Sequence, residues 1–189
     1  LFICSDEIHA GMVLNGHKHI PIASISKAAA DRTVTLMSLN KTFNFPGAGL
    51  GWMICKNPSL REMASNRIGS LIPHPEIFGY VATNAAIRDG EDWRLALLDY
   101  LNQNRKLLIE RINQIPGLKI YDIEASYLGW ISCEGIPVKD PHQLFLNHGV
   151  ALQPGYMFNQ PDHVRINIAT PHSLLNEALD RIETAIKSI

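Results

Sequence analysis

Residues 33–41 read TVTLMSLNK, and this stretch decides the fold. The apolar and β-branched part of it, residues 33–38, is typical of a strand that is buried on both faces. The strand ends just before Lys41. Because ligands of open α/β sheets bind beyond the carboxyl ends of the strands, the stretch predicts an α/β fold with a lysine at its ligand-binding edge.

Two further apolar runs flank this strand. Residues 1–5 (LFICS) are followed directly by Asp6, and residues 51–55 (GWMIC) follow the glycine-rich segment 46–51 (PGAGLG), which lets backbone pass close by. An acid and a lysine at the ends of two strands can face each other across one crevice. An arbitrary pair of this kind is usually a strand-end cap and a solvated loop lysine, so the pattern alone leaves that reading open.

Helical periodicity dominates the middle of the chain. It predicts helices over residues 59–66, 75–89 and 92–114, the second with Ile77, Phe78 and Val81 among its apolar positions and the third stopped by Pro116-Gly117. Strands are predicted at 118–121, 127–133, 150–153 and 164–168, with helices at 141–148 and at the end of the chain. We therefore expect two domains, residues 1–90 with an open parallel sheet and residues 91–189 as an α+β unit.

Composition excludes several classes of protein. Apolar residues are 46 % and charged residues 19 %, which favours a packed core over disorder. Lys and Arg total 17 against 18 for Asp and Glu, so nucleic-acid binding is not expected. No apolar run approaches the roughly 18 residues of a membrane span.

The positions of the cysteines and the absence of several common motifs narrow the possible classes of protein further. Cys4, Cys55 and Cys133 each lie in an apolar run, which predicts reduced core thiols and a cytoplasmic protein. His17 and His19 lack partners at ligand spacing, so no metal site is predicted. The glycines at 47–51 do not complete a dinucleotide-binding fingerprint, and neither a Walker A motif nor a G-x-S-x-G elbow is present.

Segments 5–9 (SDEIH) and 38–47 (SLNKTFNFPG) resemble the two cofactor-contacting segments of fold-type I pyridoxal 5'-phosphate (PLP) enzymes. More narrowly, they resemble the MalY/PatB-like cystathionine β-lyase group. The later segments HPEI, YLGWI, VALQPGYMF and VRINIATP follow in the order of that group's second half. The resemblance implies the C-terminal part of the aspartate aminotransferase-like fold, with the end of the large PLP-binding domain followed by the small domain.

The resemblance also assigns roles toward the cofactor. Lys41 would form the Schiff base with PLP and later move the proton at the substrate Cα. Asp6 would hold the pyridine nitrogen protonated, His9 would lie near the 3'-oxygen of the ring, and Ser38 would help to hold the phosphate.

Toward the substrate, Arg165 would take the α-carboxylate in a bidentate fork, and Tyr127 would line the substrate side. The alternative for Arg165 is a structural ion pair. The chain departs from the common aminotransferase signature at Asn40 and Gly49, where those enzymes have a small residue and a phosphate-binding arginine. This departure fits the lyase-like group better and leaves the phosphate to other donors.

The function expected from the resemblance is C–S β-elimination from a sulfur amino acid by a homodimeric enzyme. Transamination is the alternative. A third possibility is an effector-sensing domain of a transcription regulator, or an inactive dimerisation fragment. Since the match covers only the second half of the family, we expect this chain to belong to a longer enzyme and to be inactive alone.

Overall fold

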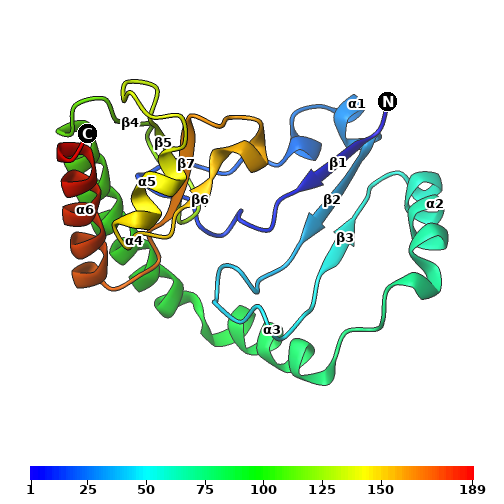
Figure 1. Cartoon of the computed structure of the whole chain (residues 1–189). Coiled ribbons are helices and arrows are strands. Elements are labelled where there is room, and N and C mark those ends of the chain that lie inside the picture. The colour runs from blue at the N-terminus through cyan, green and yellow to red at the C-terminus, as the bar shows by residue number, and fades with distance from the viewer. The chain divides into compact units, whose positions relative to one another are not determined.

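The computed structural model describes residues 1–189, apart from the side chain of Ser70, and Figure 1 shows its elements in chain order. The chain divides into two compact units, residues 1–97 and residues 98–189. Each unit contains one sheet, with strand order β1-β2-β3 in the first and β4-β5-β7-β6 in the second. Both units combine their sheet with helices, as the sequence predicts. The domain boundary predicted at residue 90 stays a prediction.

The first sheet consists of β1 (Ile3–Asp6), β2 (Thr33–Met37) and β3 (Trp52–Ile54). β1 and β2 are parallel, whereas β2 and β3 are antiparallel. The predicted parallel sheet is therefore correct for the first pair and wrong for β3. Residues 38–51 between β2 and β3 form turns and loop without a helix, whereas the connection between neighbouring parallel strands is usually an α-helix.

Short helical segments complete the first unit around its sheet. Two of them, η1 (Ile22–Ser24) and α1 (Lys27–Ala30), lie in the crossover from β1 to β2 and were not predicted. Helix α2 (Pro58–Ile68) is capped at its N-terminus by Asn57, whose Oδ1 accepts hydrogen bonds from the N–H groups of Ser59 and Leu60 at 3.0 and 3.2 Å. The helix is followed directly by η2 (Gly69–Leu71).

Helix α3 (Ile77–Asp89) buries its small residues and exposes its large ones. Its buried positions are Gly79, Thr83 and Ala86, while Phe78 is 72 % exposed. A Cβ atom at Gly79 would lie 3.0 Å from the carbonyl oxygen of Gly49, so only a small side chain allows this close approach. The helix predicted over residues 75–89 is therefore observed, but three of its large apolar side chains, Ile77, Phe78 and Val81, are exposed.

The sheet of the second unit is antiparallel throughout. Its strands are β4 (Lys119–Ile120), β5 (Leu128–Ser132), β6 (Gln153–Pro154) and β7 (His163–Asn167). Helix α5 (Pro141–Asn147) and the 3-10 turn η3 (Gly155–Phe158) lie on either side of β6 in sequence. Strand β6 is shorter and later than the predicted strand over residues 150–153, because Pro154 and η3 end the pairing within two residues.

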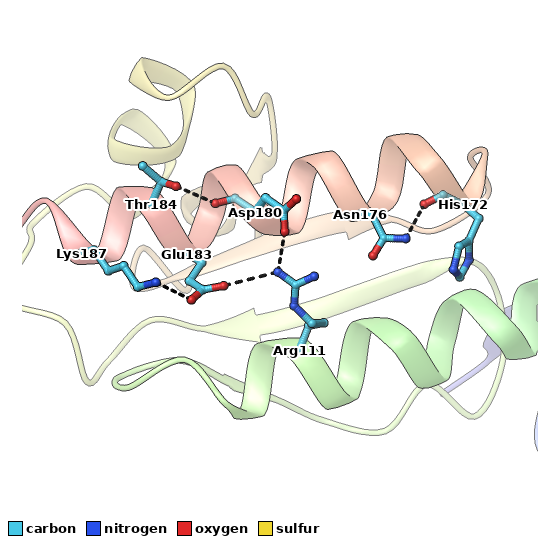
Figure 2. Close-up of polar contacts among 7 residues, drawn as sticks. All are labelled: Arg111, His172, Asn176, Asp180, Glu183, Thr184 and Lys187. Atoms are coloured by element: carbon cyan, nitrogen blue, oxygen red, sulfur yellow. Dashed lines mark hydrogen bonds and ion pairs between the residues drawn. The ribbon is translucent and has the colours of Figure 1, made fainter.

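Helices α4 (Glu91–Asn113) and α6 (His172–Lys187) supply most of the core of the second unit. The fully buried apolar side chains there include Leu101, Leu108, Ile112, Ile131, Val164, Ile168, Leu175, Leu179 and Ile182. On the outer side of the two helices, Arg111 of α4 reaches Asp180 and Glu183 of α6 at 2.7 and 3.4 Å, as Figure 2 shows. The helix predicted over residues 92–114 and the helix predicted at the end of the chain are thus both observed.

Two of the three cysteines are buried, and the third is not. Cys55 and Cys133 are core thiols as predicted, whereas Cys4 is exposed. The prediction fails at Cys4 because β1 pairs only with β2 among the described strands, and its side chains alternate between a covered and an open face. Of the helices that the structure describes, none has the length and apolar character needed to cross a membrane.

Candidate active site

Asp6 and Lys41 follow adjacent strands at the same edge of the first sheet. Asp6 is the last residue of β1 and lies opposite Leu36 of β2, and Lys41 comes four residues after the end of β2. Neighbouring strands lie about 4.8 Å apart, and both residues therefore lie at the same end of the parallel pair β1 and β2. Asp6 is exposed, and its Oδ1 accepts a hydrogen bond from the N–H of Ile8 at 3.3 Å. No hydrogen bond or ion pair occupies the Lys41 amine among the contacts described.

The turn that carries Lys41 contains buried polar atoms without a partner in the described structure. These are Oδ1 of Asn40 and Oγ1 of Thr42. Buried polar groups are normally hydrogen-bonded, so these two atoms have acceptor capacity that the described protein groups do not use. The Ser38 hydroxyl, by contrast, donates to the carbonyl of Leu50 at 2.7 Å and accepts from the N–H of Asn40 at 3.3 Å. Ser38 therefore shapes the turn, and its role toward a phosphate stays a prediction.

The loop after β1 packs tightly against this turn. A Cβ atom at Gly11 would lie 2.6 Å from Oγ1 of Thr42, so Gly11 admits the Thr42 side chain only because it has none of its own. The carbonyl of Gly11 accepts a hydrogen bond from Arg94 at 3.0 Å, and Glu91 binds the same guanidinium. His9 lies two residues earlier in this loop and is half-buried. The close packing of Gly11 against Thr42 holds the loop that contains His9 beside the turn that contains Lys41.

Glu7 anchors the other end of the same loop. Its buried carboxylate accepts hydrogen bonds from Ser5 Oγ at 2.9 Å, from His19 Nε2 at 2.7 Å and from the N–H of Ile22 at 3.2 Å. Burial alone would raise the pKa of Glu7, but the hydrogen bonds from His19, Ser5 and Ile22 and the charge of His19 together lower it below the ordinary value of 4.5. Glu7 is thus an ionised clamp directly beside Asp6.

The two predicted substrate residues lie in the second unit. Tyr127 precedes β5, and its carbonyl accepts the N–H of Ile168 at 2.8 Å. Arg165 lies in the middle of β7, opposite Trp130 on one side and Gln153 on the other. Its guanidinium donates to Oε1 of Gln153 and lies 4.9 Å from the centre of the Phe158 ring. The ion pair considered as an alternative is not found among the described side chains.

Arg165 also lines a cavity of about 460 Å³. The polar lining comes from Gln153, Arg165, Asn167 and Thr170, and apolar side chains such as Leu128, Leu152 and Leu174 supply much of the rest. A cavity with one cation and a mostly apolar wall suits a small ligand that carries one anionic group. Within the described residues, no group of three or more His, Cys, Asp or Glu side chains could hold a metal.

Sequence reasoning missed the clamp at Glu7 and the surroundings of Arg165. Glu7 and His19 are 12 residues apart without periodicity, so no local pattern joins them. Trp130 and Gln153 meet Arg165 only through the register of three antiparallel strands. The segment 150–158 that contains Gln153 and Phe158 resembles the family, but the resemblance gives these two residues no role.

Comparison with known proteins places the chain within one large group. The sequence profile described as "Aminotransferase class I and II" matches residues 1–182. Cystathionine beta-lyase PatB of Bacillus subtilis (strain 168) is 31 % identical over 195 residues, which cover 97 % of this chain and 49 % of PatB.

Solved structures agree with this result over the whole chain. The crystal structure of OvoB superposes with a TM-score of 0.97 at 43 % identity, covering 100 % of this chain and 50 % of that one. Cystalysin from Treponema denticola, whose crystal structure contains a pyridoxal 5'-phosphate cofactor, gives a TM-score of 0.92 at 28 % identity with the same coverage. The predicted fold is confirmed, and the chain spans about half the length of these relatives.

Proposed function

This chain belongs to the class I and II aminotransferase family, and from that membership we propose that the intact protein is a PLP-dependent C–S β-lyase acting on a sulfur amino acid. The reaction class is that of PatB, a relative named as a cystathionine beta-lyase, and the cofactor is the one that cystalysin contains. The observation that carries the proposal is the placement of Asp6 and Lys41 at the ends of adjacent parallel strands, with the lysine amine uncommitted among the contacts described.

The residues around this edge fit PLP. Lys41 offers an amine, Asp6 a carboxylate with unused acceptor capacity, and Asn40 a buried oxygen without a partner in the described structure. PLP, when bound, withdraws electrons from the substrate Cα, so that a proton can leave this carbon and a β-substituent can be expelled.

In this proposal, Lys41 first holds the cofactor and then takes the Cα proton on Nζ. Asp6 would hold the ring nitrogen of the bound cofactor protonated through a charge-assisted hydrogen bond and so would favour the electron-poor form of the ring. Arg165 binds and orients the α-carboxylate of the substrate. The β-sulfur would leave as a thiolate, and the 2-aminoacrylate released from the rest of the substrate would tautomerise to an imine, which one water molecule hydrolyses to pyruvate and ammonia.

The test uses the intact protein loaded with PLP. Lys41→Ala should abolish the visible absorption of the cofactor-bound protein and the release of pyruvate from cystathionine. Lys56→Ala, an exposed lysine after β3, should change neither. Borohydride treatment followed by peptide mass spectrometry should find the cofactor on the peptide that contains Lys41. Recovery of the cofactor on another lysine would refute the assignment.

Transamination is the second candidate, because the matching profile is that of the aminotransferases. The two reactions share proton removal from Cα and differ in where the next proton goes. Formation of a new amino acid that depends on an added keto acid, without release of pyruvate from cystathionine, would favour transamination. Neither activity in the loaded protein would favour a sensing domain. The homodimer that the resemblance implies stays a prediction, which sedimentation of the intact protein would test.

A further inference from the structure

Arg165 is held by neutral groups from two directions. Its Nη2 donates to Oε1 of Gln153, the residue directly across from it on β6. The amide NH2 of Gln153 faces Sδ of Met157 at 3.8 Å, which leaves the amide oxygen toward the arginine. An amide oxygen fixes the direction of a guanidinium and leaves the positive charge uncompensated, whereas a carboxylate would neutralise it.

The second direction is the face of an aromatic ring. The centre of the guanidinium lies 4.9 Å from the Phe158 ring centre, within the range of a cation–π interaction. Phe158 is itself held by Trp130, whose ring meets it edge-on at 5.4 Å.

Trp130 is fixed in turn by two contacts of its own. Its Nε1 donates to Oε1 of Gln160 at 2.9 Å, and its ring stacks on buried His163 at 5.4 Å. Asp162 binds Nδ1 of His163 at 2.8 Å, and this hydrogen bond lowers the pKa of Asp162. The carboxylate of this cluster is therefore engaged with His163, and no ion pair to Arg165 is found among the described side chains.

We propose that Gln153 and Phe158 are positioning residues, which aim the guanidinium of Arg165 at a carboxylate in the adjoining cavity while leaving its charge free for that ligand. The inference rests on the proposed function, in which Arg165 binds the substrate α-carboxylate. Two of its features make it specific: Arg165 and Gln153 line the same cavity, and both supports of the guanidinium are uncharged.

The experiment measures binding to the intact, PLP-loaded protein by calorimetry. The probes are 3-(methylthio)propanoate and its amide, 3-(methylthio)propanamide, which lack an amine and so cannot react with the cofactor. The readout is the ratio of the two affinities, which reports recognition of the carboxylate alone. Wild type should prefer the acid, and Arg165→Leu should remove the preference.

Glutamate at position 153 should compete with the ligand for the guanidinium. We expect Gln153→Glu to weaken binding of the acid about tenfold or more and to leave binding of the amide unchanged. Gln143→Glu is the matched control, because Gln143 lies exposed on α5 and binds Asn147 instead. Phe158→Leu should weaken binding of the acid about threefold, and Phe158→Tyr, which keeps the ring, should restore it.

The outcomes separate this inference from the proposed function. An unchanged acid-to-amide ratio in both Gln153→Glu and Phe158→Leu would overturn the inference, while the loss of preference in Arg165→Leu would leave the proposed function standing. Equal binding of acid and amide by wild type would instead remove the assigned role of Arg165. Near-ultraviolet circular dichroism, to which Trp130 contributes with the other aromatic side chains, verifies the fold, and if Gln153→Glu does not fold, the Phe158 pair decides.

Discussion

Replacing Glu7 by glutamine should remove one contact of the loop clamp and spare the other two. Ser5 Oγ and the N–H of Ile22 both bind Oε1, whereas His19 binds Oε2 at 2.7 Å. In Glu7→Gln an amide oxygen can keep the first two hydrogen bonds, but an NH2 group replaces the atom that faces His19. Because hydrogen bonds to a charged group contribute about 1.5–3 kcal/mol, we expect a loss of about 2 kcal/mol in the free energy of unfolding.

The pH dependence identifies the carboxylate as the cause. The pKa of Glu7 in the folded protein is lowered from its ordinary value of 4.5, so its ionised form stabilises the fold. This contribution is fully present above pH 4.5 and is lost as the pH falls through the lower, folded-state pKa. The gap between wild type and Glu7→Gln should therefore be full at pH 7 and should shrink below pH 4.5.

Urea-induced unfolding of the intact protein at pH 7 and at pH 3.5 measures both effects. Glu183→Gln is a suitable control, because Glu183 lies on the surface and pairs with Lys187 and Arg111. Exposed ion pairs contribute little, so this variant should unfold close to wild type. A Glu7→Gln variant as stable as wild type at pH 7, or a gap of constant size at both pH values, would refute the reasoning.

Two other variants or treatments test the packing of the chain. Burial raises the pKa of the Cys133 thiol to about 12, whereas Cys4 is exposed. Iodoacetamide at pH 8 should therefore label Cys4 rapidly and leave Cys133 unlabelled until the protein unfolds. Peptide mass spectrometry measures the labelling of each cysteine. Asn104 is fully buried, and its Nδ2 donates hydrogen bonds to the carbonyls of Ile168 and Thr170 at 2.8 and 2.9 Å. Asn104→Leu should therefore lower the free energy of unfolding, measured in urea, by about 2–3 kcal/mol. A loss below about 0.5 kcal/mol would contradict this account.

Much of the fold follows from local patterns in the sequence. The predicted helix over residues 92–114 is observed at Glu91–Asn113, since its ends are marked by a glycine before it and a Pro-Gly pair after it. Helix α3 shows the limit of periodicity. An apolar stripe shows where a helix has large side chains, but the closely packed face of α3 is made of Gly79, Thr83 and Ala86.

The candidate site likewise has one part that the sequence predicts and one part that it does not. Asp6 and Lys41 could be placed together from sequence, because parallel strands bring their carboxyl ends to one edge. The support of Arg165 could not be foreseen, because Gln153 reaches it only through the register of a two-residue strand. A strand predicted over residues 150–153 does not determine which of its residues lies opposite the arginine.

The tight fit of Gly11 against Thr42 bears on how this part of the chain can be redesigned. Any side chain at position 11 would collide with Thr42, so the residues at positions 11 and 42 have to be chosen together. Because Oγ1, Cγ2 and Cβ of Thr42 would all lie within 3.3 Å of a Cβ atom at position 11, a side chain there requires a smaller residue at position 42. Libraries that randomise the neighbourhood of Lys41 should therefore vary both codons together, since changing either alone would discard combinations that a paired change would keep.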